Sequence, residues 1–327
     1  MPQAADERPD PSLHRKAAIV HGAALDHTGH VTVRSIPDFD LDRTIFQTLE
    51  GKAARFIMKS RVGKEVQWAA PKAEEVHQAY TGVREQVVLP DVSPELMDFL
   101  VTECDFDVEH ADGSFLDHLY FCFEYGVSHY REQSPLVLLL HSILGTGTNT
   151  FAMDAAKIPQ LRALLSDVDW THTEAFPSAL RLLYDGHLRH ELRENKGRTL
   201  NRITMHRVID NAPLTLSGED LWIQLNYQLI HLVDFLPVSN WSAHQNDTSF
   251  ILFRDLYALL QECGQLQARI GYTPAGPRGE LKDEHLPFLA RMATRIPIDV
   301  TEKLAAKSVR KFSDRCGHSL DYQIDWA

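Results

Sequence analysis

The sequence has few cysteines, no excess of basic residues and no long apolar run. Its four cysteines lie far apart and form no C-x-x-C pair, so neither a zinc knuckle nor a redox dithiol is indicated. Four scattered cysteines in 327 residues are more typical of a reducing compartment than of a disulfide scaffold. The formal net charge of −12 argues against general nucleic-acid binding, which needs basic surface to neutralise phosphates.

The sequence also leads us to expect neither a membrane-spanning segment nor an export signal. The most apolar run, around LVLLL at 136–140, is far too short to span a bilayer. The first sixteen residues, MPQAADERPDPSLHRK, contain no continuous apolar stretch of the kind found in signal peptides. We therefore expect a cytoplasmic protein with a small-molecule substrate and neither membrane nor nucleic acid as a partner. Assembly into a homo-oligomer is left open.

The N-terminal third of the chain gives mixed signals. Residues 1–16 are polar and contain prolines, which predicts disorder. Residues 17–93 contain short β-like pieces, a helical tract at 41–58 and scattered prolines, and are interpreted as an N-terminal extension or a small subdomain. Strand signals become rare after residue 94.

The rest of the chain reads as helical. Residues 94–270 are predicted to form the main helical domain, and residues 271–327 a linker followed by a helix that packs on the core. Helix starts are expected at Ser93-Pro94, at Pro177 and at Ser217, which has Asp220 three residues later as in a capping box. The expected fold class is therefore all-α, with a mixed, partly extended N-terminal segment.

Histidine is abundant, and the interesting histidines lie in apolar surroundings. Nine of the 17 fall between residues 110 and 231. His118 and His141 sit on two neighbouring apolar segments, where an unsatisfied polar group would cost roughly 1–3 kcal/mol. A shared ligand would satisfy both, and a metal ion fits best; bonding of each histidine within an ordinary core is the alternative. Cys122, in the same apolar stretch, is expected to be a core residue.

Further ligands would have to come from later helices. A third group is expected near His187 or His190, and Asp234 lies among apolar residues near the end of a strongly amphipathic helix. A carboxylate in such a setting is rarely buried without a partner. Two histidines and one carboxylate suit a divalent metal, with Fe(II) preferred and Mn(II) or Zn(II) as alternatives.

A basic run and a small polar loop complete the candidate site. Arg189 and Arg193 belong to a basic run at 181–207, which is either a solvated face or an anion-binding wall. The loop GTGTNT at 145–150 is either a helix-ending turn or a substrate-lining loop. Ser142 and Thr146 are accordingly candidate substrate contacts.

The motif H-x-x-G-x-F-L-D-H-L, ending just after His118, and the motif H-S-I-L-G-T, starting at His141, carry a resemblance. Over about residues 108–240 the chain resembles an uncharacterised helical family within the HD-domain superfamily. That resemblance implies an HD-like helical bundle. The superfamily contains metal-dependent phosphohydrolases and a smaller branch of non-haem diiron oxygenases, which includes inositol- and phosphonate-cleaving enzymes.

The resemblance assigns roles residue by residue. His118 matches the first ligand, His141 the histidine of the HD pair and Asp234 the final aspartate. His187 lies where the oxygenase branch has an additional histidine, with His172 and His190 as rivals. Ser142 stands where the family has the aspartate of the HD pair. That aspartate ligates and bridges in two-metal enzymes, so a mononuclear His-His-Asp centre agrees better with this sequence than a dinuclear one.

Three functions follow. The favoured one is a metal-dependent enzyme acting on a small molecule, namely a non-haem iron oxygenase or related oxidoreductase. The second is a metal-dependent phosphohydrolase of a nucleotide or other phosphoester, with the basic run holding the phosphate. The third is a non-catalytic helical binding protein with a degenerate metal site.

Overall fold

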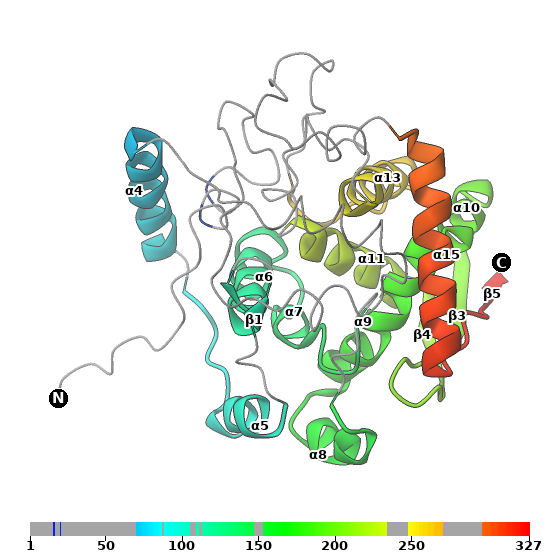
Figure 1. The fold of residues 1–327 in the computed structure, drawn as a ribbon, viewed down its shortest axis with the longest axis horizontal. Coiled ribbons are helices and arrows are strands. Elements are labelled where there is room, and N and C mark those ends of the chain that lie inside the picture. The colour runs from blue at the N-terminus through cyan, green and yellow to red at the C-terminus, as the bar shows by residue number, and fades with distance from the viewer. Residues whose placement is uncertain are drawn as a thin grey trace.

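The computed structural model describes residues 16, 20, 70–86, 88–104, 109–110, 113–146, 153–233, 248–270 and 296–327. This part of the chain is mainly helical (Figure 1). The predicted disorder of residues 1–16 and the predicted helix at 41–58 lie outside it, apart from Lys16. The N-terminal expectations therefore stay predictions.

Ten α-helices and one 3-10 helix occur in the described residues. The helices are α4 (Ala70–Gln86), α5 (Pro94–Cys104), α6 (Phe115–His129), α7 (Leu136–Leu140), η2 (Ala155–Lys157), α8 (Ile158–Ala163), α9 (Asp167–Asp185), α10 (His187–Glu194), α11 (Gly218–Val233), α13 (Thr248–Glu262) and α15 (Ile298–Cys316). In Figure 1, α6, α7, α9 and α11 lie in the middle of the molecule, with α4 at one edge and α15 toward the other.

Two of the predicted helix starts are confirmed by their caps. The Leu96 N–H donates to Ser93 Oγ at 3.1 Å, and the Asp220 N–H donates to Ser217 Oγ at 3.0 Å. Each bond satisfies a backbone donor that the first helical turn leaves without an intrahelical acceptor.

The predicted start at Pro177 is wrong. Helix α9 begins at Asp167, behind the N-cap Ser166, and continues through Pro177 to Asp185. Pro177 has no N–H to donate to Thr173 O, so the helix forgoes one bond there. The buried apolar face around Phe176 and Ala179 holds α9 in place, and tertiary packing thus overrides the local proline signal.

The expected all-α class needs a correction, because the described residues also contain strands. Strands β3 (Leu200–His206), β4 (Pro213–Ser217) and β5 (Gln323–Trp326) form an antiparallel sheet in the order β4-β3-β5. A two-residue pair, β1 (Glu109–His110) with β2 (Gly113–Ser114), precedes α6. Strand β4 alternates between exposed and buried residues, the pattern of a half-buried strand, but five residues give a weak signal.

Helix α6 is the wall shared by two hydrophobic clusters. Phe121 and Cys122 face a cluster that includes residues of α9, α11, α13 and the sheet. Leu119 and Phe123 face a second cluster, formed with α5, α7 and α8. Full burial of such a side chain contributes roughly 1.5–3 kcal/mol, so α6 is fixed from both sides. The residues that α6 carries between these clusters are held with little freedom.

Two elements near the C-terminus, α15 and β5, lie against the rest of the described residues, and the strand was not foreseen. Helix α15 contacts α9 and α13, and β5 extends the sheet. Between α15 and β5, His318 is buried and its Nε2 donates to His206 O at 2.9 Å. Burial lowers the pKa of His318 to about 4; the bond to His206 opposes this shift and the nearby Arg181 adds to it.

We expect His318 to make the protein acid-sensitive. In the unfolded chain its pKa is near 6.5, so between pH 6.5 and 4 the unfolded state binds more protons and stability falls as pH falls. Between pH 7 and 5 this corresponds to a loss of about 2 kcal/mol. Urea unfolding at the two pH values should show a smaller loss in His318→Gln, whereas the exposed control His187→Gln should behave like the wild type. Equal losses in all three proteins would contradict the assignment.

Candidate metal centre

Three buried side chains converge where α6 meets the end of α7. His118 and Cys122 are one helical turn apart on α6, and their i, i+4 spacing puts both on one face. His141 is the C-cap residue of α7, so its direction is set by the chain leaving the helix. All three are buried, with exposed fractions of 2% or less.

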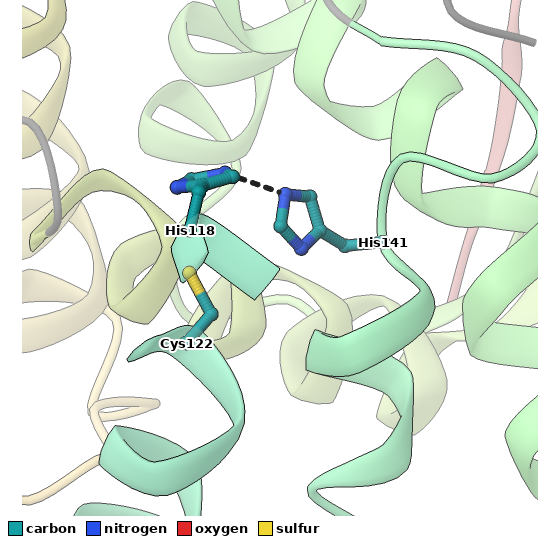
Figure 2. A group of neighbouring side chains, drawn as sticks. All are labelled: His118, Cys122 and His141. Atoms are coloured by element: carbon teal, nitrogen blue, oxygen red, sulfur yellow. Dashed lines mark hydrogen bonds between the residues drawn. The ribbon is translucent and has the colours of Figure 1, made fainter. Parts of the chain in front are cut away.

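The donor atoms of these residues lie close together. His118 Nε2 is 3.0 Å from His141 Nε2. One ring nitrogen of each histidine and Cys122 Sγ form a group whose members all lie within 4.8 Å of one another. Figure 2 shows Cys122 Sγ and His118 rising from the same helix and His141 approaching from the neighbouring segment. The arrangement can bind a metal ion.

The backbone fixes the tautomer of His141. Its Nδ1 lies 2.6 Å from Leu138 O, and a carbonyl oxygen only accepts, so Nδ1 carries the proton. In the neutral ring Nε2 is then unprotonated and presents its lone pair to His118. Metal-ligating histidines are commonly oriented by such a second bond from the ring to a carbonyl.

The spacing of the nitrogens fits a tetrahedral metal with little adjustment. Two Zn–N bonds of about 2.05 Å at a tetrahedral angle place the nitrogens roughly 3.3 Å apart. His118 Nε2 and His141 Nε2 are 3.0 Å apart, so a metal requires the two rings to separate slightly and takes the place of the proton that the two nitrogens share. The thiol of Cys122 supplies a donor of the type that zinc accepts. The residues present therefore fit a metal ion.

Two rings from other helices close the site. The His231 ring, on α11, has its centroid 4.5 Å from that of His141 and 5.4 Å from that of His118. Phe176, on α9, packs at 5.0 Å from His141 and 5.5 Å from His231. The site is thus built from α6, α7, α9 and α11, with a third imidazole beside the first two.

Among the described residues, the other predicted histidine ligand, His187, does not join this group. Asp234 lies outside the described residues, which end at Val233 in α11. His187 begins α10 after the left-handed Gly186, and its side chain is 69% exposed beside Asp185. His190 is exposed and pairs with Glu194. Because α10 turns these two histidines toward solvent, neither joins the buried group.

The two candidate arginines are tied to carboxylates. Arg189 pairs with Asp255 and, at 3.4 Å, with Glu302, while Arg193 pairs with Asp255 at 2.8 Å and Glu262 at 3.1 Å. These bonds join α10 to α13 and α15. The contacts give both arginines a structural role, and anion binding by them stays a prediction.

The two candidate substrate contacts follow His141 in the chain, Ser142 directly and Thr146 five residues later. Ser142 is buried next to it in the turn, and its carbonyl accepts from the Gly145 N–H at 3.2 Å. The carbonyl of Thr146 accepts from Nε of the buried Arg181 at 3.1 Å. Both residues are thus held through their backbone carbonyls, and contact with a substrate stays a prediction.

Asp255 offers a test of the structural role of the arginines. Asp255→Asn removes the charge that Arg189 and Arg193 share, and we expect the free energy of unfolding to fall by about 1–3 kcal/mol, since the pair is partly buried. Asp167→Asn, at a 90% exposed carboxylate paired with Arg162, is the matched control and should cost less than about 0.5 kcal/mol. Urea unfolding measures both changes, and equal effects would argue against the network.

Sequence reasoning missed two members of the site, Cys122 and His231. Cys122 looked like an ordinary core residue because it lies in an apolar helix, although its i, i+4 distance from His118 is a usable signal for shared ligation. His231 belongs to a helix whose buried face carries leucines, and nothing local distinguishes it from a core histidine. Its place beside His141 depends on how α11 packs.

The fold and the site together define a mainly helical protein with a buried histidine–cysteine cluster suited to a metal ion. Comparison with models of protein families, with curated proteins and with solved structures finds no match to this chain. Among the described residues, each helix is too short or too polar to cross a bilayer.

Proposed function

We propose that this protein binds one metal ion, Zn(II) first of all, through Cys122 Sγ and the Nε2 atoms of His118 and His141. The convergence of these three buried donors within 4.8 Å carries the proposal. Thiolate and imidazole together are typical zinc donors, whereas Mn(II) prefers oxygen ligands. A bound ion would supply Lewis-acid chemistry. The protein contributes the donors, the tautomer of His141 and the apolar wall of Phe176.

Metal titration tests the proposal. The protein is stripped with a chelator and titrated with Zn(II) or Co(II), and we expect one equivalent to bind. The Co(II) form should show a thiolate-to-cobalt charge-transfer band that Cys122→Ser removes and the control Cys263→Ser retains. Cys263 lies just after α13 and is outside the buried group. Only trace binding of both metals would contradict the proposal.

An iron oxygenase with a His118–His141–Asp234 site is the second candidate. One observation favours it: α11 brings His231 to within 4.5 Å of His141, ring to ring, and Asp234 follows the described end of that helix. Anaerobic loading with Fe(II), followed by dioxygen uptake with a panel of small molecules, tests it. Asp234→Asn should abolish the uptake; a variant as active as the wild type would exclude the carboxylate as a ligand.

The remaining sequence-based functions stay predictions. A phosphohydrolase should act on nucleotides or sugar phosphates with added Mn(II), and a panel of these substrates tests it. Stoichiometric metal without either activity would point to a non-catalytic binding protein. The order of His118 and His141 is the feature that resembles the HD superfamily. Ser142, in place of the aspartate of the HD pair, argues for one metal rather than two.

A further inference from the structure

A stripe of polar side chains lies in the middle of the contact between α9 and α11. On α9 it comprises Asp169, His172 and Thr173. On α11 it comprises Asp220, Gln224, Gln228 and His231. On α9, His172 and Thr173 follow Asp169 by three and four residues, and on α11 successive residues are four, four and three apart, so each set lies along one side of its helix. We call these seven residues the polar seam.

Contacts across the seam show that the two stripes face each other in order. His172 Nε2 lies 3.7 Å from Asp220 Oδ1, and Gln228 Nε2 donates to Phe176 O at 2.8 Å. One further step along, the ring of Phe176 is 5.5 Å from that of His231. The seam therefore runs from Asp220, a partly exposed residue, to His231 beside the metal centre.

The interior of the seam is rich in buried polar atoms without a close hydrogen-bond partner among the described residues, although the Gln224 side chain lies near enough to the His172 ring to oppose the lowering of its pKa. Five such atoms are fully buried. They are His172 Nδ1, Thr173 Oγ1, Gln224 Oε1, Gln224 Nε2 and Gln228 Oε1. Their residues are 1% exposed or less. Native proteins leave few buried groups unsatisfied, and five in one helix contact need a common explanation.

The chemistry of these atoms selects the occupant. The inner seam offers neutral donors and acceptors and no charge, and burial lowers the pKa of His172 despite the opposing effects of Asp220, Gln224 and Asp169. Neutral imidazole, hydroxyl and amide groups at short intervals match water molecules, each of which bonds to two to four polar partners. Pro177 adds to this polarity, because it cannot donate to the carbonyl of Thr173.

We propose that the polar seam holds a file of ordered water molecules and is the route by which solvent and the metal ion reach the buried centre. The second half of this statement rests on the proposed metal binding. Asp169 and Asp220 mark the outer end, where carboxylates favour the approach of a cation. The inner groups are neutral, so the metal ion can move along them toward His231 without being trapped by an ion pair.

A high-resolution crystal structure of the metal-stripped protein tests the water file. We expect electron density for waters within hydrogen-bond distance of the Gln224 amide and the Thr173 hydroxyl. A dry seam, with Gln224 bonded instead to protein atoms, would overturn the proposal. This result does not depend on whether the protein binds metal.

Exchange kinetics test the route. Zn(II) uptake, and release to excess chelator, are measured in the wild type, Gln224→Met and Thr173→Val, variants that keep side-chain volume while removing polar groups. We expect both rates to fall roughly tenfold in Gln224→Met, because the transition state for passage of the ion loses about one hydrogen bond. The Kd for Zn(II) should stay unchanged. Ser178→Ala is the control, because its hydroxyl lies on α9 but donates to His206 O outside the seam.

The outcomes separate the two proposals. Waters in the seam with unchanged rates in folded Gln224→Met and Thr173→Val would overturn the route. A changed Kd for Zn(II) with an unchanged uptake rate would also overturn the route, because the seam would then be part of the binding site. A protein that binds no zinc would remove both the proposed function and the route, and the crystallographic result would still decide whether the seam holds water.

Discussion

His141→Ala is expected to lose stoichiometric metal binding. Structural zinc sites release about 10–16 kcal/mol in total, so one of three or four ligands accounts for roughly 3 kcal/mol, or about a hundredfold in affinity. His141 also positions His118, because its tautomer makes Nε2 the acceptor at 3.0 Å. In the proposed site its removal therefore affects both histidines, and a hundredfold loss is the smaller end of the expected range.

The measurement must separate loss of a ligand from damage to the core. Leu140→Ala is the matched control, since Leu140 is fully buried one residue earlier in α7. It should cost about 2–5 kcal/mol of stability and retain one zinc per chain. The wild type should also unfold at a higher temperature when zinc is present, whereas His141→Ala should not. Equal zinc content in His141→Ala and Leu140→Ala would rule out His141 as a ligand.

Gly218→Ala is expected to be among the most damaging single-methyl additions to this chain. Gly218 is the first residue of α11, and a Cβ there would collide with the carbonyl oxygen of Leu200 in β3 and lie 2.7 Å from its carbonyl carbon. Both obstacles are backbone atoms, so no rotamer change relieves the overlap. Overpacking of this kind costs about 3 kcal/mol or more, because the helix must move away from the sheet.

The control for Gly218→Ala is Gly82→Ala in α4, where no atom lies within 4 Å of the added Cβ. Replacing a helical glycine with alanine at an open position should stabilise the protein by roughly 0.5–1 kcal/mol. Urea unfolding of the two variants should therefore give changes of opposite sign. A Gly218→Ala variant as stable as the wild type would show that α11 does not depend on this close approach.

The helical part of the fold could be predicted because its signals are local. Ser93 and Ser217 precede their helices with the expected caps, and the apolar periodicity that follows needs no tertiary information. The secondary-structure predictions failed where tertiary packing, and not the local sequence, determines the structure. Pro177 lies within α9 because the buried face of that helix outweighs one lost bond, and β5 forms because β3 is available as a partner.

The candidate site was predictable only in its first two residues. His118 and His141 could be found because a histidine in an apolar run needs a partner. Cys122 could have been added from its spacing, but His231 depends on the path of α11 through the core. His187 was attractive for its place in the sequence, and the turn at Gly186 directs it outward. Local patterns identify which side chains need a partner, but the partner is determined by how helices cross.

The position of β5 in the sheet has a consequence for the timing of folding. Strand β3 pairs on one edge with β4, its neighbour along the chain, and on the other with β5. His206 and Asp321, in contact where β3 and β5 begin to pair, are 115 residues apart in sequence. Closing so long a loop is slow, because its entropic cost precedes any gain from the contact. During synthesis the edge of β3 that later pairs with β5 therefore stays unpaired after the β3–β4 hairpin has formed. Until β5 is made, this edge can pair with strands of other chains.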